Sequence, residues 1–192
     1  DTWTWTAIDA DSKLIVSYLV GGRDSEYAMW FIDDLASRLA NRVQLTSDGH
    51  RAYLEAVEGA FGAGVDYAQL VKLYGSVGGK GADVRYSPAE CTGIRKRTVE
   101  GKPDEAHIST SYVERQNLTM RMHMRRFTRL TNAFSKKIEN HTAAIALHST
   151  QATTIRSRKA GRVMRMISQA RAQALPGAGC FIPHMVCQRW LH

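Results

Sequence analysis

The order of segments along the chain predicts a mixed α/β domain, because strand periodicity and helical periodicity alternate. Large apolar residues alternate with threonine from Trp3 to Ile8, and β-branched residues are frequent from Leu14 to Val20. The polar residues 9–13 lie between these two runs, so we expect a β-hairpin. From Ser25 to Leu39 the apolar residues have the spacing of an amphipathic helix.

A strand, a helix and a second strand are expected next, at residues 43–45, 52–61 and 65–73. The first of these strands runs into Thr46-Ser47-Asp48-Gly49. Asp48 is therefore expected at the carboxyl end of a strand, where open α/β sheets usually place their sites. Residues 74–107 are rich in glycine and predict a long irregular loop, with a small hairpin near residues 94–99.

Two helices close the predicted core, a long basic helix from Ser111 to about Leu130 and a shorter one from Ser135 to Leu147. Beyond them the composition changes to Arg, Ala, Ser and Thr, and no acidic residue follows Glu139. We therefore interpret residues 1–148 as a folded core and residues 149–192 as a basic, poorly ordered tail.

The composition is that of a globular protein, with 44% hydrophobic and 23% charged residues in a chain of 192. No run approaches the roughly 18 apolar residues of a membrane-spanning helix, and three cysteines make no disulfide framework. We expect a cytoplasmic protein without a membrane partner. The net charge of +8 favours a nucleic-acid partner, but seven cations beyond Glu139 supply most of that excess.

Asp48 and Glu114 are the candidate chemical groups. A carboxylate at a strand end and one on a distant helix can converge on a divalent cation, and hard oxygen ligands suit Mg²⁺ or Mn²⁺. Two such ions can activate a nucleophile and stabilise the leaving oxygen of a phosphodiester. Structural roles are the alternative, because Ser111-x-x-Glu114 is a capping-box pattern and Asp48-Gly49 is a common turn pair or helix cap.

The segment from Arg115 to Lys137 holds seven cations and no acid, which suits phosphate contacts as well as a solvated helix face. Helical spacing puts four residues on one stripe of the expected helix: Glu114, Leu118, Arg121 and Arg125. The opposite side supplies the apolar residues for the core: Val113, Met120, Met124 and Phe127.

Three stretches resemble a known family, the DDE transposases of bacterial insertion sequences of the insertion-sequence-one type. They are Trp5 to Asp24 (WTAIDADSKLIVSYLVGGRD), Leu45 to Tyr53 (LTSDGHRAY) and Ile108 to Lys137 (ISTSYVERQNLTMRMHMRRFTRLTNAFSKK). The last is the most specific, since a glutamate is followed by Arg115 and Asn117, by a basic residue seven positions on, and by a closing Phe-Ser-Lys. The likeness covers about residues 1–148.

The resemblance implies an RNase H-like mixed sheet flanked by helices, and metal-dependent cleavage and joining of DNA strands. Asp48 resembles the second catalytic carboxylate of the family and Glu114 the third, with a two-metal Mg²⁺ or Mn²⁺ site in the complete enzyme. Arg121 resembles the basic residue two helical turns after that glutamate. The expected DNA- or phosphate-binding residues are Arg115, Asn117, Arg121, Arg125, Arg126, Arg129, Lys136 and Lys137.

The first carboxylate of the family is the difficulty. Asp9 is one candidate ligand, but the hairpin chemistry favours a turn role for Asp9 and Asp11. The RNase H-like fold has three strands before its first helix, with the first catalytic aspartate on the first strand, whereas only two strands are expected here. By that count the run Trp3 to Ile8 is the second strand, and the first strand is expected upstream of Asp1.

The tail also departs from the family, whose members continue with an aromatic-rich segment. Its acid-free, Arg- and Ala-rich composition suggests a frameshift near His148. A zinc site is a remote alternative, because its four candidate ligands all fall in one short stub: Cys180, His184, Cys187 and His192.

The expected function is DNA transposition by a DDE transposase core, with this chain a truncated, weakly active or inactive copy. Its partners would be transposon ends and target DNA, with a homo-oligomer as in the intact family, in the bacterial cytoplasm at the nucleoid. A non-catalytic DNA-binding remnant and an RNase H-like nuclease of another type, such as a junction resolvase, are the alternatives.

Overall fold

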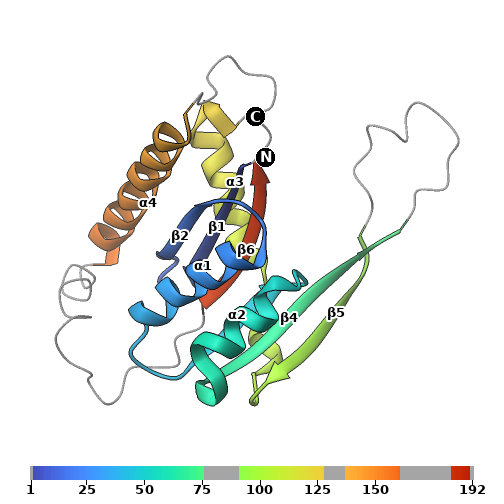
Figure 1. Ribbon diagram of the computed structural model, residues 1–192. Helices are drawn as coiled ribbons and strands as arrows, with labels where there is room; N and C mark the ends of the chain where they lie inside the picture. The colour runs from blue at the N-terminus through green and yellow to red at the C-terminus, as the bar shows by residue number, and fades with distance from the viewer. Residues whose placement is uncertain (1, 76–90, 128–136, 161–182, 191–192) are drawn as a thin grey trace, which may run out of the picture.

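The structure is a computed structural model, which describes residues 2–75, 91–127, 137–160 and 183–190, with the backbone alone for 152–160 and 183–190. It confirms the predicted mixed α/β class, because one sheet is covered by helices (Figure 1). Of the helices in this described part, none is long and apolar enough to cross a membrane.

Six strands and four α-helices make up the described fold. The strands are β1 (Thr2–Asp9), β2 (Ile15–Gly21), β3 (Val43–Asp48), β4 (Val65–Tyr74), β5 (Cys91–Glu100) and β6 (Pro183–Trp190). The helices are α1 (Ser25–Arg38), α2 (Ala52–Phe61), α3 (Ser111–His123) and α4 (Ile138–Ala160). Single turns of 3₁₀ helix occur at η1 (Gly62–Gly64), η3 (Glu105–His107) and η4 (Arg125–Phe127).

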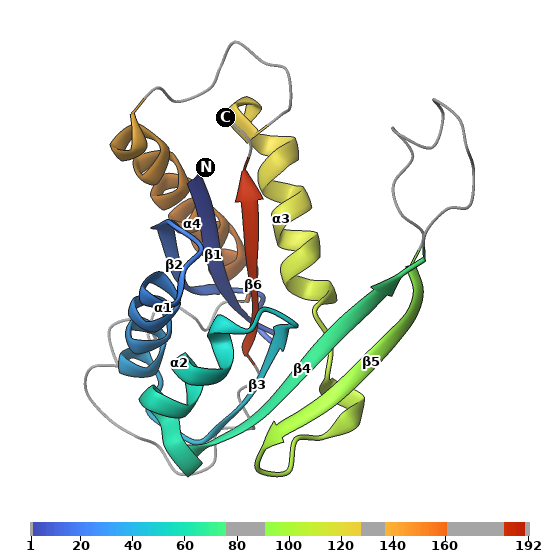
Figure 2. The same cartoon turned by 45° about the vertical axis from the view of Figure 1, so that its right-hand side comes forward.

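The strands form one mixed sheet in the order β2-β1-β6-β3-β4-β5. Antiparallel pairs join β1 to β2, β1 to β6 and β4 to β5, while β3 is parallel to both β6 and β4. The last strand of the chain therefore lies in the middle of the sheet, between β1 and β3, as Figure 2 shows.

The predicted β1–β2 hairpin is present. Its turn is closed by two backbone bonds, from the Asp9 N–H to the Leu14 carbonyl and from the Lys13 N–H to the Asp9 carbonyl, each 2.9 Å. Lys13 has a φ of 61°, in the left-handed region that tight turns require and side-chain-bearing residues rarely adopt.

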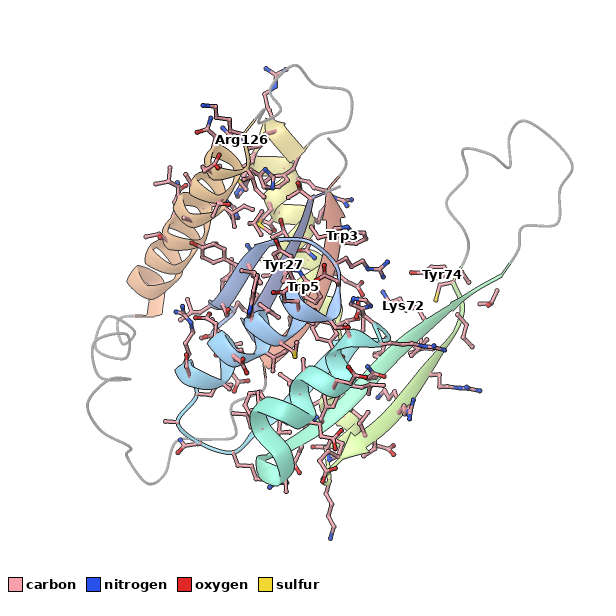
Figure 3. All side chains as sticks on the ribbon, viewed as in Figure 1. Trp3, Trp5, Tyr27, Lys72, Tyr74 and Arg126 are labelled. Atoms are coloured by element: carbon pink, nitrogen blue, oxygen red, sulfur yellow. The ribbon has the colours of Figure 1, made fainter. Side chains whose placement is uncertain are left out.

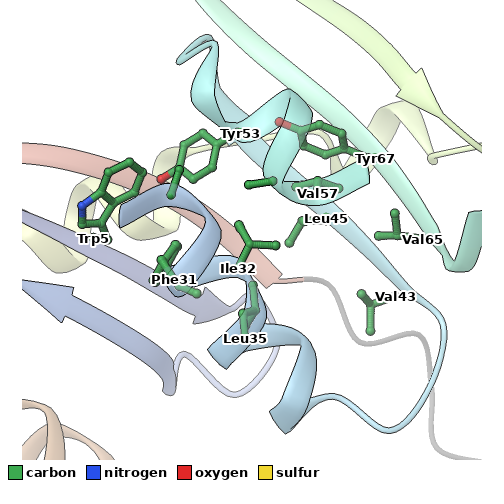
Figure 4. Close-up of a cluster of buried hydrophobic side chains, with 13 residues drawn as sticks. Trp5, Phe31, Ile32, Leu35, Val43, Leu45, Tyr53, Val57, Val65 and Tyr67 are labelled. Carbon is green, nitrogen blue, oxygen red and sulfur yellow. The ribbon is translucent and has the colours of Figure 1, made fainter. Parts of the chain in front are cut away.

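The main core lies between the sheet and the layer formed by α1 and α2 (Figure 4). Trp5 is fully buried there, and its ring centroid lies 5.8 Å from that of Phe31 and 5.4 Å from that of Tyr53. The Trp5 indole donates to the Gly22 carbonyl at 2.9 Å, so this ring buries its apolar area without losing its polar bond. The predicted α1 stripe is buried as expected at Ala28, Phe31, Ile32 and Leu35.

The opposite face of the sheet is covered by α3 and α4. Three buried residues pack together on this face, namely Met120 of α3, Phe127 of η4 and Ile145 of α4. They contact Tyr18 and Val20 of β2. The apolar side predicted for the basic helix is thus correct, but α3 ends at His123 rather than near residue 130. Met124 adopts an extended conformation, with φ −119° and ψ 107°, which takes Arg125 off the helical stripe.

Three further expectations differ from the structure. Where a small hairpin was expected within residues 74–107, β5 is a ten-residue strand paired along β4. The helix expected at 135–147 extends over Ile138–Ala160, without a break at the boundary expected near residue 148. Residues 183–190, expected in a poorly ordered tail, pair with β1 and β3. In each case long-range pairing or packing outweighs a weak local pattern.

Candidate functional site

Asp48 lies at the last position of β3. Side chains alternate along a strand, and because Val43 and Leu45 face the core under α1 and α2, Asp48 faces the α3 side. Asp48 pairs in register with Leu70 of β4. One of its carboxylate oxygens, Oδ1, accepts the His50 N–H at 3.1 Å, so the expected turn is present as well.

Glu114 lies in the first turn of α3, with its side chain 42% exposed. Its Oε1 accepts the Thr110 hydroxyl at 2.7 Å, and its Oε2 binds the Lys72 ammonium at 2.6 Å. Lys72 follows Leu70 by two positions on β4, so it lies on the same face of the sheet as Asp48. Figure 3 shows Lys72 beside the junction between the β4–β5 ribbon and the rest of the molecule.

The two carboxylates interact electrostatically. Burial raises the pKa of Asp48 to about 6, and repulsion from Glu114 adds to this rise, while the His50 N–H and the charge of Arg23 oppose it. The structure thus brings together the two acidic residues that the sequence singled out. A carboxylate whose charged form is disfavoured by burial and by a second acid is typical of functional sites.

The capping alternative for Glu114 is not what the structure contains. Thr110 is the N-cap residue of α3 and Ser111 is already helical, so the expected Ser111–Glu114 box does not form. The Glu114 carboxylate is bonded instead to Thr110 and to Lys72 of the neighbouring strand.

Asp9 uses its carboxylate within its own turn. The side chain is 4% exposed and accepts the N–H groups of Asp11 at 3.2 Å and Ser12 at 2.9 Å, together with the Ser12 hydroxyl. These hydrogen bonds give the Asp9 carboxylate a structural role in the turn, as the sequence analysis expects.

Asp48 and Glu114 supply the hard oxygen ligands that Mg²⁺ or Mn²⁺ prefers. They are few, and one oxygen of Glu114 is already bonded to the Lys72 ammonium. Within the described ranges no cluster of three or more His, Cys, Asp or Glu residues is placed to hold a metal. Asp48 and Glu114 are the residues that would hold a divalent cation here, and the Lys72 ammonium competes for one of the Glu114 oxygens.

The expected phosphate-binding residues divide into exposed and buried ones. Arg115, Arg121, Arg125 and Lys137 are exposed. Arg126 is half-buried and donates to the Asn140 carbonyl at 3.1 Å. Asn117 is 4% exposed, because it lies on the inner side of α3, so its side chain is not on the surface that DNA would contact.

Several expected residues lie outside the described part. These are Arg129 and Lys136 of the phosphate-binding set, and Cys180 and His192 of the zinc alternative. His184 and Cys187 lie on β6, of which the backbone alone is described.

Three residues near the carboxylates were not predicted: Lys72, Arg23 and His50. Arg23 lies with its guanidinium carbon 4.5 Å from the Trp3 ring centroid, and its carbonyl is 3.2 Å from His50 Nε2. The available signal for Lys72 was a lone cation two positions from Leu70 within a strand pattern, but its partner Glu114 is distant in sequence and could not be inferred from that pattern.

Comparisons of the chain with protein-family models, with curated proteins and with solved structures found no significant match.

Proposed function

We propose that this chain is the catalytic core of a DDE-type transposase with an RNase H-like fold, acting on DNA phosphodiesters, and that this copy is impaired in catalysis. The observation that carries the proposal is the convergence of Asp48 and Glu114, from a strand end and a distant helix, on one face of the sheet. The resemblance assigns catalytic roles to these same two residues.

The strand order supports the RNase H-like part of the proposal. If β1 and β2 are the second and third strands of an antiparallel meander, the first strand belongs on the free edge of β1. In this sheet β6 lies on that edge, antiparallel to β1 and parallel to β3. Its sequence, residues 183–190, contains no Asp or Glu, so β6 brings no third carboxylate. Metal binding should then be weak, which is the reason for proposing an impaired enzyme.

The exposed cations of α3 and the turn after it support DNA as the partner. Arg115, Arg121 and Arg125 are exposed, and Glu114 is the single acid of α3. Phosphate contacts by such side chains provide affinity without sequence specificity. Transposon ends and target DNA, a homo-oligomeric assembly and a place at the bacterial nucleoid follow from the family resemblance and belong to the same proposal.

Nicking of supercoiled plasmid DNA in Mg²⁺ and in Mn²⁺ tests the proposal. Slow nicking is expected, and it should disappear in Asp48→Asn and in Glu114→Gln while persisting in Asp11→Asn, a matched control in the exposed hairpin turn. Nicking that survives both site substitutions would refute the site. Nicking that is lost in Asp9→Ala, with the fold intact, would show that Asp9 is the first catalytic carboxylate and that β1 is not the second strand of an RNase H-like fold.

A non-catalytic DNA-binding remnant is the second candidate, favoured by the Lys72–Glu114 ion pair, which occupies an oxygen that a metal would need. Salt-sensitive, sequence-indifferent DNA binding without any nicking in Mn²⁺ is the expected result for this candidate.

A further inference from the structure

The β4–β5 ribbon is a two-stranded antiparallel pair of ten-residue strands. Its register runs from Tyr67 opposite Glu100 to Tyr74 opposite Cys91. β5 is the last strand in the sheet order, so its outer edge carries no strand among the described residues. Figures 1 and 2 show the outer part of the ribbon extending beyond the helices that cover the rest of the sheet.

This ribbon carries three consecutive exposed cations, Arg95, Lys96 and Arg97. Arg95 pairs with Val71 and Arg97 with Gln69, so both arginines lie on one face of the ribbon. Within the described part of the chain, neither arginine takes part in an ion pair. Lys96 lies on the other face, where its ammonium donates to the Glu105 carbonyl at 2.6 Å.

The face with the two arginines adjoins the loop that follows Asp48. A Cβ at Gly49 would lie 2.9 Å from a methyl carbon of Val71, the residue opposite Arg95. The Gln69 amide, opposite Arg97, lies 3.5 Å from the His50 carbonyl. The two arginines therefore lie beside the loop that follows Asp48, on the face of the sheet opposite to the one on which Asp48 and Lys72 lie.

The positive charge of the ribbon favours a polyanion over a second copy of the chain as its partner. A second copy of the chain pairing antiparallel along β5 about Lys96 would put arginine opposite arginine, and like charges directly opposite are destabilising. A polyanion has the complementary charge. The major groove of duplex DNA is wide enough to admit a two-stranded β-ribbon, so the shape is compatible as well.

We propose that the β4–β5 ribbon over residues 69–74 and 91–97 is a DNA-contacting arm in which Arg95 and Arg97 bind backbone phosphates. The arm holds the duplex beside the loop that follows Asp48, at the carboxyl end of β3. This inference rests on the proposed function for the identity of the polyanion, and it adds a contact surface separate from α3.

The test is fluorescence anisotropy of the full chain with a labelled duplex of arbitrary sequence, over a range of salt concentrations. The double variant Arg95→Gln with Arg97→Gln should bind roughly ten-fold more weakly at moderate salt. The slope of log affinity against log salt should fall by about 1.8, because each phosphate contact contributes about 0.9. Arg95→Lys with Arg97→Lys retains both charges and should retain most of the binding.

A matched control removes the same charge elsewhere, with Arg38→Gln and Lys102→Gln, both exposed, and should leave the slope nearly unchanged. If the ribbon variant binds like the wild-type chain while Arg121→Gln weakens binding, the ribbon is not a DNA-contacting arm, and the proposed function stands. If the wild-type chain binds no DNA at all, both fail. The thermal transition of each variant, expected to match that of the wild type, excludes unfolding as the cause.

Discussion

At the scale of single residues, Asp48 must be ionised to bind a cation, yet its surroundings favour the neutral form. Burial raises its pKa to about 6 and the nearby Glu114 adds to the effect. The folded protein thus holds a charge in a place that disfavours it, which is a common cost of functional sites. The charge of Glu114, the second carboxylate, is balanced by its ion pair with Lys72.

Asp48→Asn should stabilise the folded protein at neutral pH. The pKa of Asp48 is about 6 in the folded protein, whereas the ordinary value for an aspartate, 3.8, applies to the unfolded chain. Between these two pH values the folded state therefore binds more protons than the unfolded state. The free energy of unfolding therefore falls as pH rises from about 4 to about 6 and stays lowered above that. The asparagine variant lacks this loss and should gain on the order of 1–3 kcal/mol at pH 7.

Urea unfolding of wild type and variant at pH 4 and at pH 7 measures this gain. The two proteins should differ least at pH 4, where the carboxyl is protonated in the folded state. An Asp48→Asn protein that is less stable than wild type at pH 7 would mean that the carboxylate is a stabilising structural group.

Lys72→Met should strengthen binding of Mn²⁺. The Lys72–Glu114 pair is partly exposed, with side-chain exposures of 30% and 42%, so its loss should cost at most about 1 kcal/mol of stability. Removing the competing ammonium frees the Glu114 oxygen, and affinity for Mn²⁺ should rise roughly three- to ten-fold, the equivalent of about 1 kcal/mol.

Titration of Mn²⁺ by electron paramagnetic resonance gives the affinity without any need for activity. Lys102→Met, an exposed lysine whose side chain forms none of the observed ion pairs, is the matched control and should not change it. Equal affinities for wild type and Lys72→Met would show that Lys72 does not compete with the metal.

At the scale of elements, one side of α3 packs against the rest of the protein and the other side carries the candidate functional residues. Its inner side buries Val113, Gln116, Asn117 and Met120 against the sheet and α4, and its outer side presents Glu114 and the exposed arginines. The buried amide of Gln116 lies 3.3 Å from His148 Nε2 of α4, so polar as well as apolar contacts hold these helices together. The position of Glu114 therefore depends on the packing of the opposite side of the same helix.

Met120→Ala should destabilise the protein by about 2–4 kcal/mol, because Met120 is 1% exposed and its removal leaves a cavity beside Phe127 and Ile145. Met122→Ala, two residues away and 75% exposed, should change stability by no more than about 0.5 kcal/mol. Chemical denaturation measures both. A similar effect of the two substitutions would contradict the orientation of α3.

At the scale of the whole molecule, β6 joins the two halves of the sheet. It pairs over its full length with β1 and at two positions with β3, so that without it the β2–β1 hairpin and the β3–β4–β5 unit would have no strand between them. The hydroxyls of Thr4, Thr6 and Thr46 are buried near this junction without a hydrogen-bond partner in the described part.

A chain ending at Ala160 should lose its cooperative thermal transition, because removal of β6 leaves two unpaired strand edges in the middle of the sheet. Differential scanning calorimetry and near-ultraviolet circular dichroism measure this, with Val186→Pro in the full chain as a second variant, since proline interrupts a central strand. A truncated chain with an unchanged melting temperature would show that β6 is not part of the folded sheet.

The sequence by itself determined what depends on neighbours along the chain. The β1–β2 hairpin, the buried stripe of α1, the strand that ends at Asp48 and the apolar side of α3 all follow from local periodicity and turn chemistry. The tertiary structure alone decided which distant segments meet: Lys72 with Glu114, Glu114 with Asp48, and β6 with β1 and β3. The physical reason is that strand pairing and the burial of charge depend on partners far away in the sequence, and no local pattern around Lys72 or residues 183–190 specifies those partners.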